Sequence, residues 1–133
     1  MQLVSPEKIL YSGEATFVLA RTLGGGDIAF LEGHAPFIGA LAIHPVLIRP
    51  AGGGDDVVVA VHGGFVEVSN NKVTILSDVA ELASSIDVRR AEEARARAEA
   101  EVARGGNEPD DAAVAALRRA EVRLEVASAA RAA

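Results

Sequence analysis

Short apolar segments alternate with turn residues over the first two thirds of the chain. The apolar segments cover residues 15–20, 28–31, 46–48, 57–61, 65–68 and 73–76, with glycine, asparagine or proline in most of the stretches between them. Segments of this length that are rich in β-branched residues predict antiparallel strands. Asn70-Asn71 predicts a tight hairpin, because asparagine tolerates the left-handed backbone of a primed turn. The glycine-rich stretch 49–56 predicts a longer hairpin loop.

The pattern changes near Ser84-Ser85, where aromatic residues stop and alanine becomes the commonest residue. Residues 87–133 hold sixteen alanines and nine of the thirteen basic residues. Alanine, glutamate and arginine favour helix, so a helix is predicted over residues 88–104, with Gly105-Gly106 as its stop. The spacing from Ser84 to Asp87 is that of a capping box at its start.

A second helix is expected after this stop. Residues 107–111 supply a cap, acidic side chains and, in Pro109, an early helical proline. The helix is predicted to run on through Leu117 and Leu124. Because the connection is short, the two helices are expected to fold back on each other as an antiparallel hairpin. The strand-rich part is predicted to be a small antiparallel sandwich or barrel.

The contact between the two helices is predicted to be weak. The candidates for this seam are small or aliphatic side chains, namely Val88, Ala91, Ala98 and Val102 facing Val114, Leu117 and Leu124. An alanine-lined interface buries little apolar surface, at about 25 cal/mol per Å². The pattern therefore predicts either helices whose mutual packing is easily lost, as in a switch, or a passive solvated hairpin.

The composition excludes several classes of site. The chain has 133 residues, a formal net charge of −6 and no cysteine, so it forms neither a disulfide nor a thiolate metal site. Its acidic character argues against sequence-independent binding to nucleic acid or anionic lipid. The apolar runs are too short to cross a bilayer, and residues 1–10 lack the pattern of a secretory signal. We therefore expect a soluble protein of a reducing compartment.

No catalytic centre and no metal site are predicted. The glycine clusters do not continue into Gly-Lys-Ser/Thr, so turns explain them better than a phosphate-binding loop does. His34, His44 and His62, with Glu32 near the first of them, lack a diagnostic ligand spacing and are expected to be ordinary structural residues. No serine lies in a Gly-x-Ser-x-Gly elbow.

Two arginines of the second helix stand out by their neighbours. Arg97 is flanked by Glu93 and Glu101, and most other arginines also have an acid at helical spacing. Arg119 and Arg123 have none, because their neighbours three and four positions away are alanine, valine and each other. Such a pair suits an anion or an acidic partner surface. Neutral drift is the alternative explanation, because the repulsion costs only a few tenths of a kcal/mol.

Four segments resemble the epsilon subunit of the F-type ATP synthase. They are residues 3–8 (LVSPEK), 26–36 (GDIAFLEGHAP), 63–76 (GGFVEVSNNKVTIL) and 81–91 (ELASSIDVRRA). Their order and spacing, ahead of an alanine- and arginine-rich hairpin, make the resemblance specific. It departs from the family at Leu31-Glu32, where members commonly have Leu-Pro.

The resemblance implies an α+β fold. An N-terminal antiparallel β-sandwich over residues 1–84 would be followed by a C-terminal antiparallel α-helical hairpin over residues 85–133. It also implies a non-catalytic central-stalk subunit at the cytoplasmic face of the bacterial plasma membrane. The sandwich would bind the gamma subunit and the c-ring, and so couple proton-driven rotation to ATP synthesis. The helices would extend towards the alpha and beta subunits and inhibit ATP hydrolysis. The alternative is a free-standing β-sandwich binding module with an oligomerising helical tail.

Residues 86–91 match a motif, Ile/Leu-Asp-x-x-Arg-Ala, through which some bacterial members bind ATP. The resemblance implies no required cofactor, with ATP as a regulatory ligand. The implied site consists of Glu81, Ile86, Asp87, Arg90, Ala91, Arg97, Arg119 and Arg123. The alternative is that Asp87 only caps a helix and that the arginines meet an acidic surface of a beta subunit.

Overall fold

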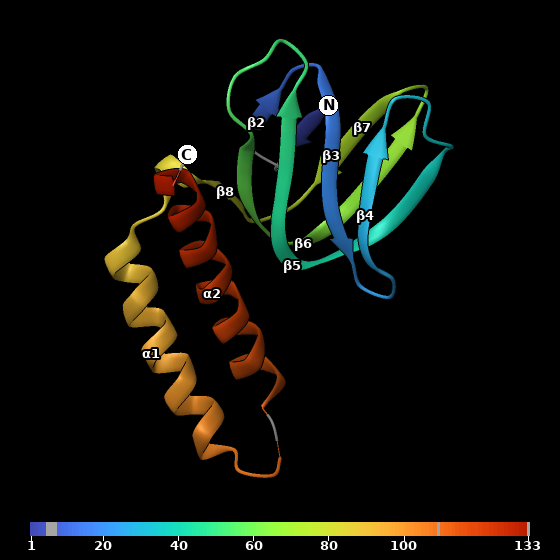
Figure 1. Ribbon diagram of the computed structural model, residues 1–133. Helices are drawn as coiled ribbons and strands as arrows, with labels where there is room; N and C mark the ends of the chain where they lie inside the picture. Colours follow the sequence, from blue (N-terminus) through green and yellow to red (C-terminus); the bar gives the residue numbers. More distant parts are fainter. Residues whose placement is uncertain (5–7, 109, 133) are drawn as a thin grey trace.

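The computed structural model describes residues 1–4, 8–108 and 110–132, and in this part of the chain strands precede helices (Figure 1). The strands are β1 (Gln2–Val4), β2 (Ile9–Ser12), β3 (Ala15–Thr22), β4 (Gly26–Leu31), β5 (Phe37–Pro50), β6 (Val57–Ser69), β7 (Lys72–Leu76) and β8 (Ala80–Leu82). A 3₁₀ turn (Ala83–Ser85) leads to α1 (Val88–Arg104) and α2 (Asp111–Ala132). The predicted β-sandwich followed by a helical hairpin is confirmed.

The strands form one sheet that curls over on itself, in the order β2-β1-β7-β6-β5-β3-β4, with β8 paired to β6. Neighbouring strands are antiparallel except β1 and β7, which run parallel. The long strands β5 and β6 pair along most of their length. The first half of β6 also pairs with β8 and its second half with β7, so β6 joins both parts of the sheet.

The bend that separates the two halves of β6 lies at Gly63-Gly64. Both glycines have a positive φ, 84° and 125°. A Cβ atom on Gly64 would lie 2.1 Å from the carbonyl oxygen of Leu76 on β7. Only glycine lets the two strands approach so closely. The buried Ser77 supports the same corner, with Oγ 2.7 Å from the carbonyl oxygen of Gly63 and 2.9 Å from that of Val79.

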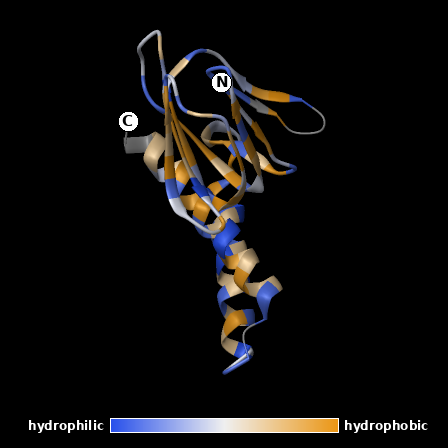
Figure 2. Ribbon diagram, turned by 90° about the vertical axis from the view of Figure 1, so that its right-hand side faces the viewer, coloured by the Kyte–Doolittle hydropathy of each residue, from blue (hydrophilic) through white to orange (hydrophobic). Residues whose placement is uncertain are grey.

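Alternate side chains of the curled sheet point inward and form one apolar core. Its buried members come from the five strands β3 to β7, and the fully buried ones include Val18, Ile48, Val59, Val66 and Ile75. Figure 2 shows hydrophobic residues along the strands, whereas hydrophobic and hydrophilic residues alternate along the protruding part of the hairpin. The period of two in the sequence therefore corresponds to the burial of one face of each strand.

Both predicted hairpin turns are confirmed. Asn70 and Asn71 have φ values of 52° and 61° and join β6 directly to β7. Residues 51–56 form the longer connection between β5 and β6, and the two strands pair antiparallel on either side of it. Asparagine adopts this left-handed backbone at little cost, which explains why the tight turn falls here.

The first helix has its N-cap three residues later than a capping box starting at Ser84 predicts. Asp87 is the N-cap, and its Oδ1 accepts a hydrogen bond from the backbone N–H of Arg90 at 3.1 Å. The prediction of a box starting at Ser84 is wrong, because Ser84 and Ser85 belong to the preceding 3₁₀ turn. The predicted stop is confirmed, since α1 ends at Arg104 and Gly106 has a φ of 57°.

The second helix is capped by Asp110, whose Oδ1 accepts from the backbone N–H of Ala112 at 3.0 Å. The prediction of Pro109 as an early helical residue lies outside the described residues. No helix in the described ranges is both long enough and apolar enough to cross a membrane.

The helix α2 has two buried sides. Ala113, Ala120 and Ala127 recur every seven residues, and the buried residues of α1, Ala91 and Ala98, have the same spacing. Residues 120 and 122 lie about 200° apart around a helix, so the alanines and the valines occupy different sides. The valines Val122 and Val126 pack with Ala60 of β6. Val114 is 43% exposed, so its predicted place in the seam is wrong.

Candidate functional site

A pocket of about 390 Å³ lies where α1, α2 and β8 meet. Its lining is mostly charged or small, and consists of Glu81, Ser85, Asp87, Arg90, Ala91, Ala94, Arg97 and Arg123. Glu81 comes from the short strand β8, Arg90 to Arg97 come from the first part of α1, and Arg123 comes from the middle of α2. Residues separated by forty positions in the sequence therefore share one cavity.

The helix α1 presents one face to this pocket. Arg90, Ala94 and Arg97 are four and three positions apart, which places them on the same side of the helix. Asp87 stands at the mouth because it is the N-cap. Ala91, which is 3% exposed, is small enough to let the helices approach closely.

Glu81 on β8 joins the pocket to both α2 and the sandwich core. Its Oε1 accepts a hydrogen bond from Nε of Arg123 at 2.6 Å and lies 3.0 Å from Nε2 of His62. The His62 side chain is 1% exposed, and within the described residues its Nδ1 has no hydrogen-bond partner. Burial lowers the pKa of His62 and the cations Arg123 and Arg119 act in the same direction, whereas Glu81 raises it. His62 is therefore held neutral.

Six of the eight residues implied by the resemblance line this one pocket, namely Glu81, Asp87, Arg90, Ala91, Arg97 and Arg123. Ile86 does not, because it packs against the apolar cluster of Ala60, Val122 and Val126. Arg119 does not line it either; it lies one turn before Arg123 on α2 and is half-buried.

Two lining residues, Ser85 and Ala94, were not identified from the sequence. The signal for Ala94 was present, because it stands at helical spacing between Arg90 and Arg97. Ser85 had no such signal, since it precedes the helix.

The ion pairs differ from those predicted by helical spacing. Glu93 pairs with Arg89 at 3.5 Å and Glu101 with Arg104 at 2.6 Å, so in the described part of the chain Arg97 has no ion pair. Arg123 is paired after all, with Glu81. An arginine side chain is long enough to reach several acidic residues. Which ion pair forms therefore depends on the packing around it as well as on its spacing along the helix.

The arrangement suits an anionic ligand. Three guanidinium groups and two carboxylates give the lining a formal charge of +1. Among the described residues Arg97 has no ion pair, and Arg123 pairs with one carboxylate, that of Glu81. Both guanidinium groups can therefore bind a ligand. Guanidinium groups bind phosphate oxygens in a bidentate manner, and carboxylates accept from amino or hydroxyl groups.

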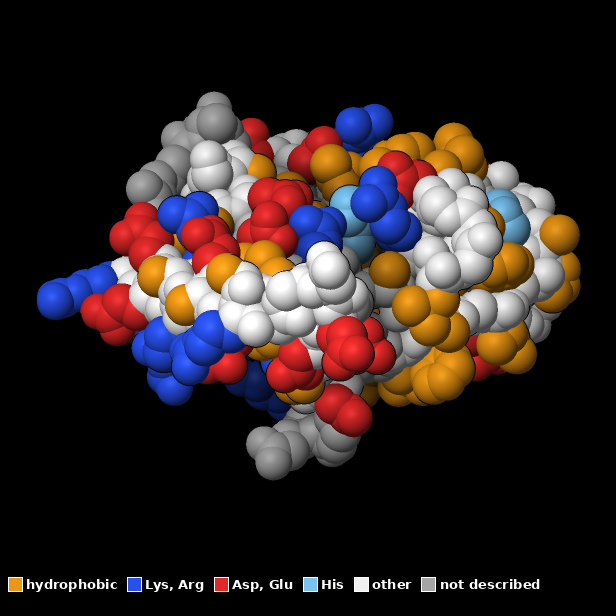
Figure 3. All heavy atoms as spheres, turned by 90° about the horizontal axis from the view of Figure 1, so that it is seen from below, with side chains coloured by type: hydrophobic (Ala, Val, Ile, Leu, Met, Phe, Trp, Pro, Cys, Tyr) orange, Lys and Arg blue, Asp and Glu red, His pale blue; other side chains and the backbone are white. Residues whose placement is uncertain are grey.

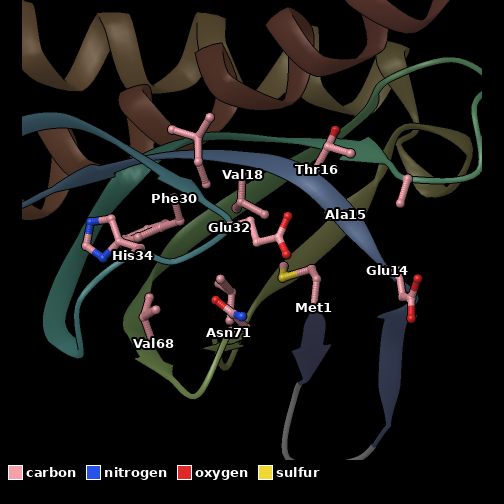
Figure 4. A pocket seen from close by; sticks show the side chains of 13 residues that line it. Met1, Glu14, Ala15, Thr16, Val18, Phe30, Glu32, His34, Val68 and Asn71 are labelled. Carbon is pink, nitrogen blue, oxygen red and sulfur yellow. The ribbon is translucent and has the colours of Figure 1, made fainter.

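A second pocket, of about 400 Å³, lies among the sandwich strands near the turn that contains Glu32 and His34 (Figure 4). The His34 ring contacts Phe30 edge-on, with centroids 5.0 Å apart. Its Nδ1 lies 2.7 Å from the carbonyl oxygen of Ala35. These contacts give His34 a structural role. Over the described ranges, no group of three or more potential ligands is placed to hold a metal ion.

Comparison with known proteins places these features in a family. Residues 1–83 match the family described as "ATP synthase, Delta/Epsilon chain, beta-sandwich domain", and residues 84–128 match the corresponding "long alpha-helix domain". The "ATP synthase epsilon chain" of Streptomyces griseus is 45% identical over 93% of this chain and 90% of its own length. That of Symbiobacterium thermophilum is 42% identical over 97% and 92%.

This chain belongs to the ATP synthase epsilon chains. As an epsilon chain it is a non-catalytic subunit of the complex. Its fold is also similar to that of a chain in the cryo-EM structure of the Euglena gracilis mitochondrial ATP synthase, with a TM-score of 0.67 and 23% identity. That likeness covers 98% of this chain and 78% of the other, and at this identity it concerns the fold.

Proposed function

We propose that this epsilon chain is a central-stalk rotor subunit whose C-terminal helices regulate ATP hydrolysis and sense ATP. In this proposal residues 1–84 bind the gamma subunit and the c-ring and couple rotation to ATP synthesis. Residues 85–133 form the regulatory unit, which extends towards the alpha and beta subunits when it leaves the sandwich. The chain would then lie at the cytoplasmic face of the bacterial plasma membrane, attached through the complex.

An exposed apolar face of the sandwich supports the docking role. Ile38, Phe65 and Leu76 are 75%, 59% and 50% exposed. Phe65 pairs across the sheet with both Leu76 and Ala40, and Ile38 lies two residues before Ala40, so these side chains share one outer face. Contiguous exposed apolar side chains mark a protein interface. We assign this face to the gamma subunit.

The observation that carries the ATP-sensing role is the pocket between α1, α2 and β8. It gathers Arg97 and Arg123 from two helices together with Asp87 of the motif. A nucleotide bound there would contact both helices and β8 at once. Because the helix seam is lined by alanine, such a ligand would stabilise the folded hairpin by its own binding free energy. ATP would thereby oppose the extended, inhibitory form.

Titration calorimetry of the full chain with ATP tests the pocket. Binding is expected, and Arg97→Ala or Arg123→Ala is expected to weaken it about 10- to 100-fold, the size of a lost charged hydrogen bond. The double variant Arg97→Ala with Arg123→Ala should abolish it. Arg95→Ala is the matched control, because Arg95 pairs with Glu99 along α1 and does not line the pocket. Absence of binding, or binding indifferent to these arginines, would refute the assignment.

Deletion of residues 87–133 tests the regulatory role. The sandwich core is made by residues of the strands, so it should remain folded without the helices. In the reconstituted complex, ATP hydrolysis is expected to rise when the helices are absent. Unchanged hydrolysis would mean that the helices are not inhibitory.

A further inference from the structure

Arg118 joins α2 to β5 of the sandwich at a point remote in sequence from the pocket motif. Its Nε donates to the carbonyl oxygen of Ile43 at 3.1 Å, and its second guanidinium nitrogen lies 2.9 Å from Nδ1 of His44. The remaining nitrogen donates to Glu125 at 3.1 Å. A guanidinium group has donors and no acceptor, so His44 Nδ1 must be the acceptor. The contact therefore requires a neutral His44 with its proton on Nε2.

The charges around His44 come from three elements. Arg21 of β3 and Asp27 of β4 form an ion pair at 2.8 Å, and Asp27 lies 3.9 Å from His44 Nε2. The helix α2 contributes Arg118 and Glu125, whereas β6 places the apolar Val61 opposite His44. Figure 3, which views the molecule from below, shows basic and acidic side chains intermixed over the helices. Two cations and two anions therefore surround one titratable ring.

These surroundings favour the neutral ring. The His44 side chain is 20% exposed. Burial lowers the pKa of His44, and Arg21 and Arg118 act in the same direction, while Asp27 and Glu125 oppose them. Protonation would turn the Nδ1 acceptor into a donor that faces another donor. It would also bring a second positive charge to within hydrogen-bonding distance of Arg118.

We propose that His44 and Arg118 form a proton-sensitive latch, in which neutral His44 holds α2 on the sandwich and protonated His44 releases the helical hairpin. The rest of the attachment consists of Val122 and Val126 packed on Ala60, with the Arg123–Glu81 pair beside them. Ile43, Val58, Ala83 and Ile86 surround this apolar contact. None of these apolar contacts changes its charge with pH, so the Arg118–His44 contact can make the attachment respond to protons. Because α1 packs on α2, it leaves together with α2. This latch uses none of the residues that line the nucleotide pocket.

The hairpin should be released as the pH falls, because the docked contact requires a neutral His44. Released His44 would titrate near its ordinary pKa of about 6.5, whereas docked His44 titrates lower. The released form therefore binds more protons between these two values. The latch holds fully above about pH 6.5 and weakens as the pH falls from there through the lowered pKa.

Thiol labelling of the full chain tests the latch. Val126 is fully buried against the sandwich, and the chain has no native cysteine, so Val126→Cys introduces a single reporter thiol. Its labelling rate by a dipyridyl disulfide, divided by the rate in urea at the same pH, gives the released fraction. This fraction is expected to rise by up to about tenfold per pH unit as the pH falls below 6.5, the limit for one proton.

Substitutions of His44 and Arg118 show whether their contact causes the rise in the released fraction at low pH. In His44→Gln a side-chain oxygen replaces Nδ1 without titrating, so the hairpin should stay docked and most of the rise should disappear. Arg118→Gln removes the facing cation; it should increase release at neutral pH and flatten the rise. His34→Gln, in a turn of the sandwich away from α2, should behave as the parent chain does.

Three results would overturn the latch. One is a released fraction independent of pH, and another is an undiminished rise in His44→Gln. The third is equal labelling of a Val66→Cys variant in the sandwich core, because it would mean that the whole chain unfolds rather than that the hairpin leaves. If the pH-dependent rise in the released fraction is lost in His62→Gln and kept in His44→Gln, the responsible proton binds His62 on β6 and not His44.

Discussion

Nε of Arg123 on α2 lies 2.6 Å from Oε1 of Glu81 on β8, and this pair ties the second helix to the sandwich. The two side chains are 27% and 26% exposed, so water screens them only in part. The same Oε1 lies 3.0 Å from Nε2 of His62. One carboxylate oxygen thus connects the sandwich core, the short strand β8 and the mobile part of the proposed switch.

Replacing this carboxylate should loosen the hairpin. Glu81→Gln keeps the size of the side chain but removes its charge, and leaves Arg123 uncompensated. We expect docking of α2 to weaken by about 1 kcal/mol, which is a rise of about fivefold in the labelling of the Val126→Cys reporter. Glu101→Gln is the control, because its partner Arg104 is 71% exposed and the pair should contribute almost nothing. Equal effects of the two substitutions would contradict a structural role for Glu81.

The bend of β6 should not tolerate a side chain. Gly64→Ala places a Cβ atom 2.1 Å from the carbonyl oxygen of Leu76 at a φ of 125°. Relieving this overlap must move backbone, so we expect a loss of more than about 3 kcal/mol in the free energy of unfolding. Gly52→Ala in the β5–β6 loop meets no atom within 4 Å and has no positive φ, so it should be nearly neutral. Urea unfolding monitored by circular dichroism compares the two variants.

Asp87 caps α1 and also lines the proposed ATP pocket, and two substitutions can separate these roles. Asp87→Ala removes the acceptor of the Arg90 N–H and should cost about 1 kcal/mol of helix stability. Asp87→Ser restores a capping oxygen without the charge, so thermal unfolding should return close to that of the parent. If Asp87→Ser still weakens ATP binding in calorimetry, Asp87 contributes to the ligand as well as to the cap. If ATP binding is fully restored by serine, capping explains its place in the motif.

The sandwich itself should lose stability on acidification through His62. Burial lowers the pKa of His62 in the folded chain, whereas the unfolded chain titrates near 6.5. The unfolded state therefore binds more protons below pH 6.5, and the free energy of unfolding falls as the pH drops through the lowered pKa. The slope for one histidine is at most about 1.4 kcal/mol per pH unit. Urea unfolding at pH 7.5 and at lower pH should show a smaller difference in His62→Gln than in the parent chain; an identical difference would exclude His62.

Local features were predictable from the sequence because they depend on a few neighbouring residues. Asn70-Asn71 forms the tight turn that its backbone preference indicates, and Gly105-Gly106 ends α1. The error at Ser84 is also local. Either Ser84 or Asp87 could start a helix, and the 3₁₀ turn after β8 decides in favour of Asp87.

The pairing of distant elements was not predictable in the same way. β1 lies parallel to β7 because the curled sheet brings the first residues beside a strand seventy positions later. Arg123 shows the same limit at the site, since its partner Glu81 is forty-two positions away on another element. Arg97 has acids at helical spacing but forms no ion pair with them in the described structure. Glu93 pairs with Arg89 and Glu101 with Arg104 instead.

The amino-acid sequence was enough to predict the alternation of strands and turns, the two helices and the family motif at residues 86–91. The strands, turns and helices follow from preferences that act within one or two turns of chain, whereas the motif comes from the resemblance to the family. The packing of the elements determines that six of the eight residues implied by the resemblance share a pocket, that Ile86 packs in the apolar cluster instead, and that His44 meets Arg118. These contacts depend on how α2 packs against β5 and β6, and side-chain spacing along one helix carries no information about the neighbour on which it docks.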